Sequence, residues 1–382
     1  MKSLIPQIDQ LNQVLNYLKT TFVGKDEIID LMGIALVARE NLFLLGPPGT
    51  AKSAMVRALA KLLKGNTFEY LLTRFTEPNE LFGPFDIRKL REGELLTNTE
   101  GMLPEASLIF LDELLNANSA ILNSLLMVLN ERIFRRGRET KDLPALMIVG
   151  ASNHLPQDDA LQALFDRFLV RVRCDNVEPD LLGSVLDAGW KLEQAAPVAP
   201  PQISAEDITF LQGLIGAVDL QAIRQPYMDL IQQLRNAGIQ ISDRRAVKLQ
   251  RLIAASALLC QRQEVVLSDF WVMRYIWDTE EQQELIAGMV NTVVKRDETP
   301  AQHPRATQSA LPNADEIFKE VSKLAQKWEA SETSLVERNQ IKDRLRYLNG
   351  RCEWIANDNQ RTYVQQPIDA LWKRILQQPG LN

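Results

Sequence analysis

One stretch constrains this chain more than any other: a short apolar run that breaks into glycines and prolines and then a lysine followed by a hydroxyl. It reads Leu-Phe-Leu-Leu-Gly-Pro-Pro-Gly-Thr-Ala-Lys-Ser and covers residues 42–53. The spacing from Gly46 to Lys52 and Ser53 is that of a phosphate-binding loop, in which backbone N–H groups and a helix N-terminus surround oligophosphate oxygens. Lys52 is expected to reach the β and γ phosphates, and Ser53 to hold Mg²⁺. The stretch therefore predicts a nucleotide-binding domain.

The loop departs from the general pattern GxxxxGK[ST] at one position, where Ala51 stands in place of glycine. Because this position opens a helix, we expect Ala51 to adopt right-handed backbone dihedrals, which alanine does without strain. An ordinary turn between a strand and a helix is the alternative interpretation of the whole stretch.

The composition is that of a soluble globular chain long enough for two or three domains, with 382 residues and 46% hydrophobic content. A net charge of −6 argues against general binding to nucleic acid or anionic membrane, which requires a surplus of Lys and Arg. Cys174, Cys260 and Cys352 are far apart without a CxxC pair, and His154 and His303 are too few for a histidine metal site. No export signal or long apolar run occurs, so we expect a cytoplasmic protein without membrane insertion.

Helical and strand patterns alternate through the first half of the chain, which predicts a parallel sheet with helices on its faces. Helical spacing of apolar residues occurs at 8–22 and 28–36, after the loop at 54–63, and again at 116–131. Continuous apolar runs predict the strands, which we place at 42–45, 67–72, 107–111, 145–151 and 168–172.

Two interruptions and three boundaries complete the predicted organisation. Periodicity weakens between Thr73 and Pro104, which indicates a hairpin-like insertion, and residues 132–140 resemble a second hairpin with a basic tip. The proline-containing segment 195–201 cannot continue a helix and marks a domain boundary. We therefore expect an α/β domain at 1–195, an all-helical domain at 202–296, a polar linker at 297–312 and a small helical bundle at 313–382.

Two carboxylates follow the apolar strand predicted at 107–111. A strand this apolar is typical of the middle of a sheet, beside the strand that leads into the phosphate loop. Asp112 is expected to hold Mg²⁺ through water, and Glu113 to polarise the attacking water as general base. A solvated strand end is the alternative for this pair.

A polar pair, Ser152-Asn153, follows a run of small and apolar residues in the next strand. We expect Asn153 to lie level with the carboxylates, where its amide orients the water or contacts the γ phosphate. An ordinary turn asparagine is the alternative.

Two arginines are candidates for contact with the phosphates from a distance. Arg167 comes directly before the last strand, at the sheet edge rather than in the nucleotide cleft, so we expect it to act on a neighbouring subunit. A structural arginine paired with Asp166 is the alternative. Arg244 opens a helix of the second domain after Ser242, and it is expected to point back across the cleft and sense the γ phosphate; simple surface charge is its alternative.

Together these motifs resemble the MoxR branch of the AAA+ ATPases, and within it the RavA-like group. The match covers roughly residues 20–285 and includes an alanine before the loop lysine, which is usual in that family. The residues that carry the resemblance are Val23-Gly24, Gly46–Ser53, Thr73-Arg-Phe-Thr76, Leu81-Phe-Gly83, Leu103-Pro-Glu-Ala106, Phe110-Leu-Asp-Glu113, Asn130-Glu-Arg132, Ser152-Asn153 and Asp166-Arg-Phe168.

The resemblance implies an AAA+ P-loop core, an all-α lid and a C-terminal helical bundle, assembled as a ring that is usually a hexamer and uses ATP and Mg²⁺. It implies a helix-2 insert near 77–100 and a pre-sensor-1 hairpin near 132–140. A von Willebrand factor A domain protein is the implied partner. By the same resemblance Ser53 and Asp112 hold the metal, Glu113 is the Walker B base, Asn153 is sensor 1, Arg167 the arginine finger and Arg244 sensor 2. The implied nucleotide-binding residues are Val23, Gly24, Gly46, Pro47, Pro48, Gly49, Thr50, Ala51, Lys52 and Ser53.

Three functions follow as competing hypotheses. The first is an Mg-ATPase ring that remodels or matures a client protein, which the sequence does not name. The second is a nucleic-acid motor, supported only by Arg135, Arg136 and Arg138 in the predicted hairpin and opposed by the acidic net charge. The third is a nucleotide-gated scaffold, which is disfavoured because nucleotide binding alone would not require Glu113, Asn153 and Arg167.

Overall fold

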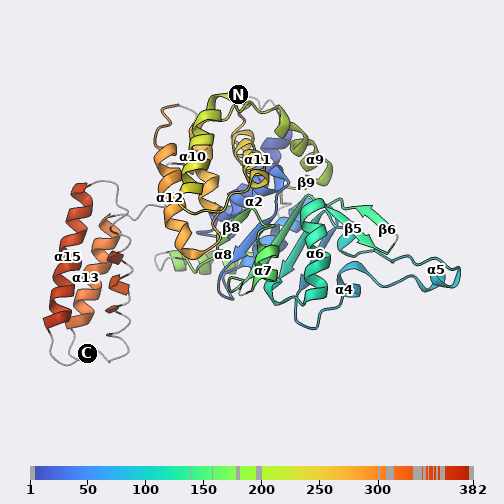
Figure 1. Ribbon diagram of the computed structural model, residues 1–382, viewed down its shortest axis with the longest axis horizontal. Coiled ribbons are helices and arrows are strands. Elements are labelled where there is room, and N and C mark those ends of the chain that lie inside the picture. The colour runs from blue at the N-terminus through green and yellow to red at the C-terminus, as the bar shows by residue number, and fades with distance from the viewer. Residues whose placement is uncertain are drawn as a thin grey trace.

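The computed structural model resolves an α/β domain followed by helical domains (Figure 1). Its described residues are 5–137, 139–156, 158–177, 181–194, 200–299, 302–306, 314–329 and 358–377, together with 338, 341–342, 344–346, 348–349 and 352.

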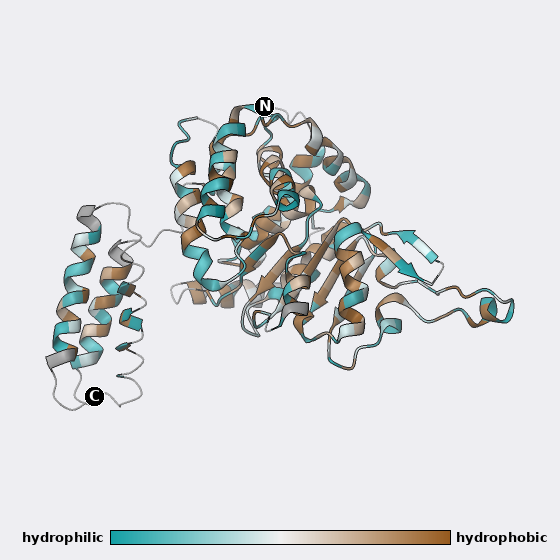
Figure 2. Cartoon of the chain, viewed as in Figure 1, coloured by the Kyte–Doolittle hydropathy of each residue, from teal (hydrophilic) through white to brown (hydrophobic). Residues whose placement is uncertain are grey.

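Five parallel strands form the centre of the α/β domain, in the order β3-β4-β7-β1-β8. Every residue of β1 and β7 is buried, and Figure 2 shows the strands of this sheet predominantly in the brown of apolar residues. The predicted parallel sheet is confirmed. The strands are β1 (Leu42–Leu45), β3 (Thr67–Leu71), β4 (Leu108–Asp112), β7 (Met147–Ser152) and β8 (Val170–Arg173).

Helices connect and cover these strands, because parallel neighbours need long crossover connections. One group brings α1 against α2, α3 and α8, and in a second group α6 packs against α7. Apolar residues at helical spacing, such as Leu11, Leu15 and Leu18 of α1, face the core. The helices are α1 (Pro6–Thr21), α2 (Asp26–Ala38), α3 (Lys52–Leu62), α6 (Ser119–Glu131), α7 (Asp159–Phe165) and α8 (Leu182–Gln194).

The insertion predicted as hairpin-like has two antiparallel arms, joined by a bridge between Phe85 and Thr97. It also contains two short helices that the sequence analysis did not predict, and Figure 1 shows the second of them, α5, at the far end of a projection. These elements are α4 (Pro78–Phe82) and α5 (Ile87–Arg91), and the 3₁₀ turn Leu103–Glu105 leads back into the sheet.

The second predicted hairpin is present and is tied to the first insertion. Arg136 donates to the carbonyl of Gly83 at 2.8 Å, and Thr97 donates through its hydroxyl to Glu139 at 2.7 Å. The two insertions therefore form one unit, while Arg138 lies outside the described residues. The antiparallel strands are β5 (Ile133–Arg136) and β6 (Glu139–Asp142).

The region predicted as an all-helical lid begins with a short strand, β9, that pairs in parallel with β2 of the α/β domain. Ser204 and Ser242 cap helices, each accepting a backbone N–H bond through its hydroxyl. The aromatic segment that follows Ser268 is a 3₁₀ helix rather than an α-helix. The elements are β2 (Leu63–Lys64), β9 (Ile203–Ser204), α9 (Ala205–Leu214), α10 (Arg224–Asn236), α11 (Asp243–Leu259), η6 (Leu267–Tyr275) and α12 (Glu280–Val294).

The predicted linker at 297–312 is docked over its described part, residues 297–299 and 302–306, which corrects the expectation of a free connection. The ring of His303 stacks on Trp271 with centroids 5.0 Å apart, and Arg305 pairs with Asp30 of α2 at 2.6 Å. The segment therefore holds lid and α/β domain together. Residues 300–301 and 307–312 lie outside the described residues.

The C-terminal helices have a hydrophobic cluster of their own, which agrees with a separate small bundle. This cluster includes the buried side chains of Ile341, Leu345, Leu348 and Cys352. Across the helices that the structure describes, none combines the length and the apolarity needed to cross a lipid bilayer. The two long helices are α13 (Ala314–Glu329) and α15 (Asp358–Gln377).

Candidate functional site: two edges of one sheet

The phosphate loop leaves the carboxyl end of β1 and passes close to the segment that follows β8. The N–H of Gly46 donates to Ser152 O at 3.0 Å, which ties the start of the loop to β7. A Cβ atom at Gly46 would lie 2.1 Å from the carbonyl oxygen of Cys174. Only glycine fits this approach, so the first residue of the loop is set by packing against a neighbouring strand end.

Ala51 has φ +67° and ψ +18°, so it lies in the left-handed region, and the expectation of right-handed dihedrals was wrong. The chain must reverse its course here before α3 begins at Lys52. A non-glycine residue in this conformation costs about 1 kcal/mol. The glycine of the general pattern therefore has a conformational reason, and this chain carries the strain instead.

Lys52 is buried beneath the loop, and its ammonium group is held by two of the loop's own oxygens. Nζ donates to Gly46 O at 2.6 Å and to Pro47 O at 2.9 Å. These carbonyls stand in for phosphate oxygens, which are the stronger acceptors for an ammonium ion. Because α3 begins at Lys52, its N-terminal N–H groups and dipole also favour an anion here.

The two residues expected to hold Mg²⁺ are in direct contact. The hydroxyl of Ser53, in the first turn of α3, donates to Asp112 Oδ2 at the end of β4 over 2.8 Å. A hydroxyl and one carboxylate, completed by phosphate oxygens and water, form the oxygen-rich and incomplete ligand set that Mg²⁺ uses in nucleotide sites. The donor set therefore fits the ion together with a nucleotide.

Glu113 follows Asp112 in a left-handed conformation, with φ +49°. Burial raises the pKa of its carboxyl, and the neighbouring Asp112 carboxylate raises it further, while Lys52 and His154 act in the opposite direction. A strained backbone and a raised carboxyl pKa occur together at catalytic positions, where they place and tune a proton acceptor. Glu113 therefore has the surroundings of a general base.

Asn153 and the Val23-Gly24 segment border the same edge. Asn153 is exposed directly after β7, the strand between β4 and β1, and Ser152 is in register with Leu45 of β1. Gly24 has φ +73°, and a Cβ atom at this position would lie 3.1 Å from Cγ1 of Val177, which follows β8. The expected residues of the nucleotide site are thus collected around the carboxyl ends of three adjacent strands, where open α/β sheets bind ligands.

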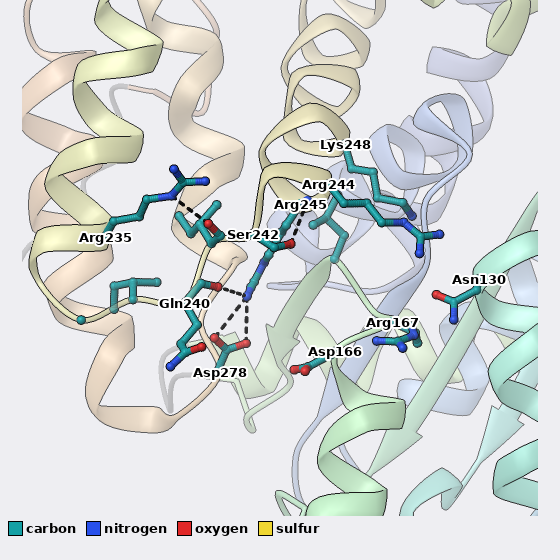
Figure 3. Close-up of a pocket in the computed structure, with 14 residues that line it drawn as sticks. Asn130, Asp166, Arg167, Arg235, Gln240, Ser242, Arg244, Arg245, Lys248 and Asp278 are labelled. Carbon is teal, nitrogen blue, oxygen red and sulfur yellow. Dashed lines mark hydrogen bonds and ion pairs between the residues drawn. The ribbon is translucent and has the colours of Figure 1, made fainter.

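Arg167 and Arg244 are not at that edge but line a separate pocket of about 570 Å³ (Figure 3). The side chains of the two arginines lie on the same side of the pocket, near Asn130 at the end of α6. Arg167 Nε has no hydrogen-bond partner among the described residues. Asp166, the alternative structural partner, lies 3.7 Å from Arg171 instead.

Two contacts fix this pocket at the amino ends of the strands. Asn41, which precedes β1, donates through its side-chain amide to Arg167 O at 2.8 Å. Lys248, one turn after Arg244 on α11, pairs with Glu40 at 2.8 Å. The length of β1, about 16 Å from Asn41 to Gly46, separates this edge from the phosphate loop.

The expectation that Arg244 reaches back across its own cleft therefore disagrees with the structure. Arg244 extends from the first turn of α11 into the pocket that contains Arg167. Its position in the sequence was identified correctly as a helix start, but the direction depends on how the lid packs, which no local pattern reports.

Sequence reasoning also missed three residues beside this pocket: Arg171, Arg245 and Asp278. Arg171 is fully buried on β8 and forms an ion pair with Asp278. The available signal was an arginine inside the apolar run 168–172, because a charged side chain in a buried strand requires a partner.

Comparisons with known proteins identify the family to which the two domains belong. A family model described as the MoxR domain in the MoxR-vWA-beta-propeller ternary systems matches residues 9–213, and an AAA lid domain model matches residues 219–290. An uncharacterized protein of Methanocaldococcus jannaschii is 36% identical over 286 residues, covering 73% of this chain and 72% of the relative. A protein named chaperone MoxR1 from Mycobacterium tuberculosis is 24% identical over 215 residues, covering 55% of each chain.

The fold also has a solved counterpart. A candidate ATPase from Cytophaga hutchinsonii superimposes with a TM-score of 0.62 at 19% identity, covering 76% of this chain and 95% of that one. At this identity the likeness shows the fold alone, whereas the family model spans more than half of the chain. The chain belongs to the MoxR family of AAA+ ATPases.

Proposed function

We propose that this protein hydrolyses ATP with Mg²⁺ in a homo-oligomeric ring, usually a hexamer in this family, in which each site is completed by arginines of the neighbouring subunit. The observation that carries the proposal is the separation of the two halves. Lys52 and Glu113 lie at the carboxyl edge of the sheet, while Arg167 and Arg244 lie at the amino edge. No single subunit brings them together.

The carboxyl edge supplies binding and proton transfer. Lys52, released from its two loop carbonyls, binds the β and γ phosphates, and the N-terminus of α3 holds the same oxygens. Glu113 accepts a proton from the attacking water, and Asn153 orients that water. Ser53 and Asp112 would hold Mg²⁺, which would supply positive charge to the phosphate oxygens. The overall reaction consumes water and ATP and yields ADP and phosphate.

The amino edge supplies positive charge to the neighbour. Among the described residues, Arg167 Nε has no hydrogen-bond partner, and the adjacent carboxylate of Asp166 lies near Arg171 instead. In a ring it stabilises the charge that develops on the transferred phosphoryl group, as an arginine contributed in trans does. Because Arg244 shares its pocket, it acts on the same neighbour and not on its own nucleotide.

We also propose that hydrolysis drives remodelling or maturation of a client protein together with a von Willebrand factor A domain partner. The description of the matching family model, which names a MoxR–vWA–β-propeller system, and the relative named as a chaperone support this proposal. The assignment to the RavA-like group and the cytoplasmic location stay predictions.

Work on nucleic acid is less favoured by the surroundings of the basic hairpin. Arg136 lies over the ring of Phe85 at 4.0 Å and donates to Gly83 O and to Asn79, so its guanidinium is already engaged. The hairpin arginine thus has a structural task in joining the two insertions.

Mixed rings test the proposal. Arg167→Ala protein keeps a complete carboxyl edge, and Lys52→Ala protein keeps a complete amino edge. We expect each alone to lose about 10³-fold in kcat, and we expect their mixture to recover a measurable part of the parental ATPase rate.

The matched control replaces the second component with the double variant Lys52→Ala/Arg167→Ala, which has no finger to contribute. Phosphate release is measured for each mixture over a range of ratios. Equal rates with the single and the double variant would contradict completion of the site by a neighbour.

A further inference from the structure

A carboxylate in the lid, Asp278, lies between two arginines that belong to different elements. Arg245, in the first turn of α11, donates through Nη1 to both carboxylate oxygens of Asp278 at 3.2 Å. Arg171, on β8, forms an ion pair with the same carboxylate and donates to the carbonyl of Trp277 at 2.7 Å. Asp278 thus joins the lid helix α11 to the central sheet.

Each of these two arginines is close in sequence to one that faces the neighbouring subunit. Arg245 directly follows Arg244, and its backbone N–H completes the Ser242 cap at 3.2 Å. Arg171 reaches back to the turn before β8, where it donates to Phe165 O at 3.3 Å and lies 3.7 Å from Asp166. The network therefore holds both segments that carry the arginines of the amino edge. Figure 3 shows the bonds between Arg245 and Asp278.

Burial makes this contact restrictive. Arg171 is fully buried, and burial lowers its pKa to about 10. A buried guanidinium needs its carboxylate in one geometry, and such a pair contributes more to a defined arrangement than to net stability. One further contact joins the sheet to the lid, since Arg173 of β8 lies 3.3 Å from Glu280 of α12. Within the lid, Arg245 also donates to Gln240 O at 3.0 Å.

We infer that Asp278 is a positioning residue: through Arg171 and Arg245 it fixes the spacing of Arg167 and Arg244, so that both reach the nucleotide of the neighbouring subunit. This inference rests on the proposed function. The contacts recorded for the Asp278 carboxylate are to Arg171 and Arg245, so the inferred role acts through these two side chains. Its effect is on the transition state of a site in another subunit, which distinguishes it from a residue that only stabilises its own fold.

The place of the substitution in a mixed ring provides the test. Asp278→Asn is added either to the Lys52→Ala donor, whose amino edge is used, or to the Arg167→Ala acceptor, whose amino edge is idle. We expect kcat of the mixture to fall about tenfold or more with the donor placement, because small displacements of a charge-stabilising group are costly in rate. The acceptor placement is expected to stay within about twofold of the unsubstituted mixture, because its arginines serve no active site.

A second variant avoids leaving the buried Arg171 without its counterion. Arg245→Gln keeps the Arg171–Asp278 pair and removes the connection of Asp278 to α11, together with the bonds from Arg245 to Gln240 O and Ile276 O. It should show the same dependence on placement. Asp243→Asn is the matched control, since this side chain is 96% exposed and pairs only with the surface residue Arg235 among its recorded ion pairs. Both placements of the control should retain the rate.

Equal losses of rate from the donor and the acceptor placement would overturn the inference in favour of a purely structural role. An unchanged rate with both placements would also overturn it. Failure of the unsubstituted mixture to recover any activity would instead overturn the proposed function itself. Ring assembly is measured by size-exclusion chromatography for every mixture, so that a failure to assemble is separated from a loss in kcat.

Discussion

The carboxyl and amino edges of the central sheet differ in what positions their functional groups. At the carboxyl edge the main chain does most of the positioning: Ala51 and Glu113 both have positive φ, and Gly46 is packed against Cys174. At the amino edge long side chains are held by ion pairs that cross from the sheet to the lid. The first edge is a rigid binding site, whereas the second depends on how two domains pack.

In the proposed ring, this difference indicates which of the two edges can be adjusted. Backbone contacts between adjacent strands leave the phosphate loop little freedom relative to Asp112 and Asn153. Arg167 belongs to the α/β domain and Arg244 to the lid, so a change in the angle between the domains changes the distance between the two arginines. Regulation by a client or partner is therefore expected at the amino edge, through the lid.

The largest expected effect is at the carboxyl edge. Glu113→Gln keeps the shape of the side chain but removes the proton acceptor, so kcat should fall by about 10²–10⁴-fold while ATP binding is retained. Steady-state phosphate release and equilibrium binding of a fluorescent ATP analogue measure the two properties separately.

The control for this substitution is Glu206→Gln, at an exposed position in the first turn of α9, which should leave both properties near the parental values. A Glu113→Gln protein that turns over ATP at a rate near the parent would contradict the assignment of the base.

At the amino edge the comparison is sharpened by Arg244→Ala. If this residue serves the neighbour, the substitution should reduce the recovered rate by about 10²-fold in the Lys52→Ala donor and leave the Arg167→Ala acceptor unaffected. Arg224→Ala, at the exposed start of α10, is the matched control. Loss confined to the acceptor would restore the original expectation that Arg244 senses its own nucleotide.

The carboxyl edge could be predicted from the sequence because its residues stand in short contiguous motifs at the ends of apolar strands. Lys52, Ser53 and Asp112 needed only the rule that parallel strands end together, and the structure places Ser53 in contact with Asp112. The expectation that the strand of Asp112 lies directly beside the strand of the loop was wrong, because β7 lies between β4 and β1. At the amino edge, Arg167 and Arg244 could each be identified from the sequence, but their proximity could not. The common pocket of Arg167 and Arg244 depends on lid packing, as does the position of Asp278.

Two further misses have the same origin in tertiary structure. Residues 302–306 looked like a linker because they are polar, yet Arg305 finds its carboxylate 275 positions away at Asp30. Ala51 was expected to begin a right-handed turn, but the approach of the loop to neighbouring strands imposes the left-handed one. Local propensity describes what a residue prefers, and packing decides what it must adopt.

The smallest expected effect tests that conformation directly. Ala51→Gly relieves a left-handed alanine, worth about 1 kcal/mol, and loses a similar amount through the more flexible unfolded chain, so the free energy of unfolding should change by less than about 0.5 kcal/mol. Ala58→Gly, in the middle of α3, has right-handed helical geometry and should lose about 1 kcal/mol. Denaturant titration of both variants measures the difference. If the two substitutions destabilise equally, Ala51 is not held in the left-handed region, and the carboxyl edge is less strained than its backbone angles indicate.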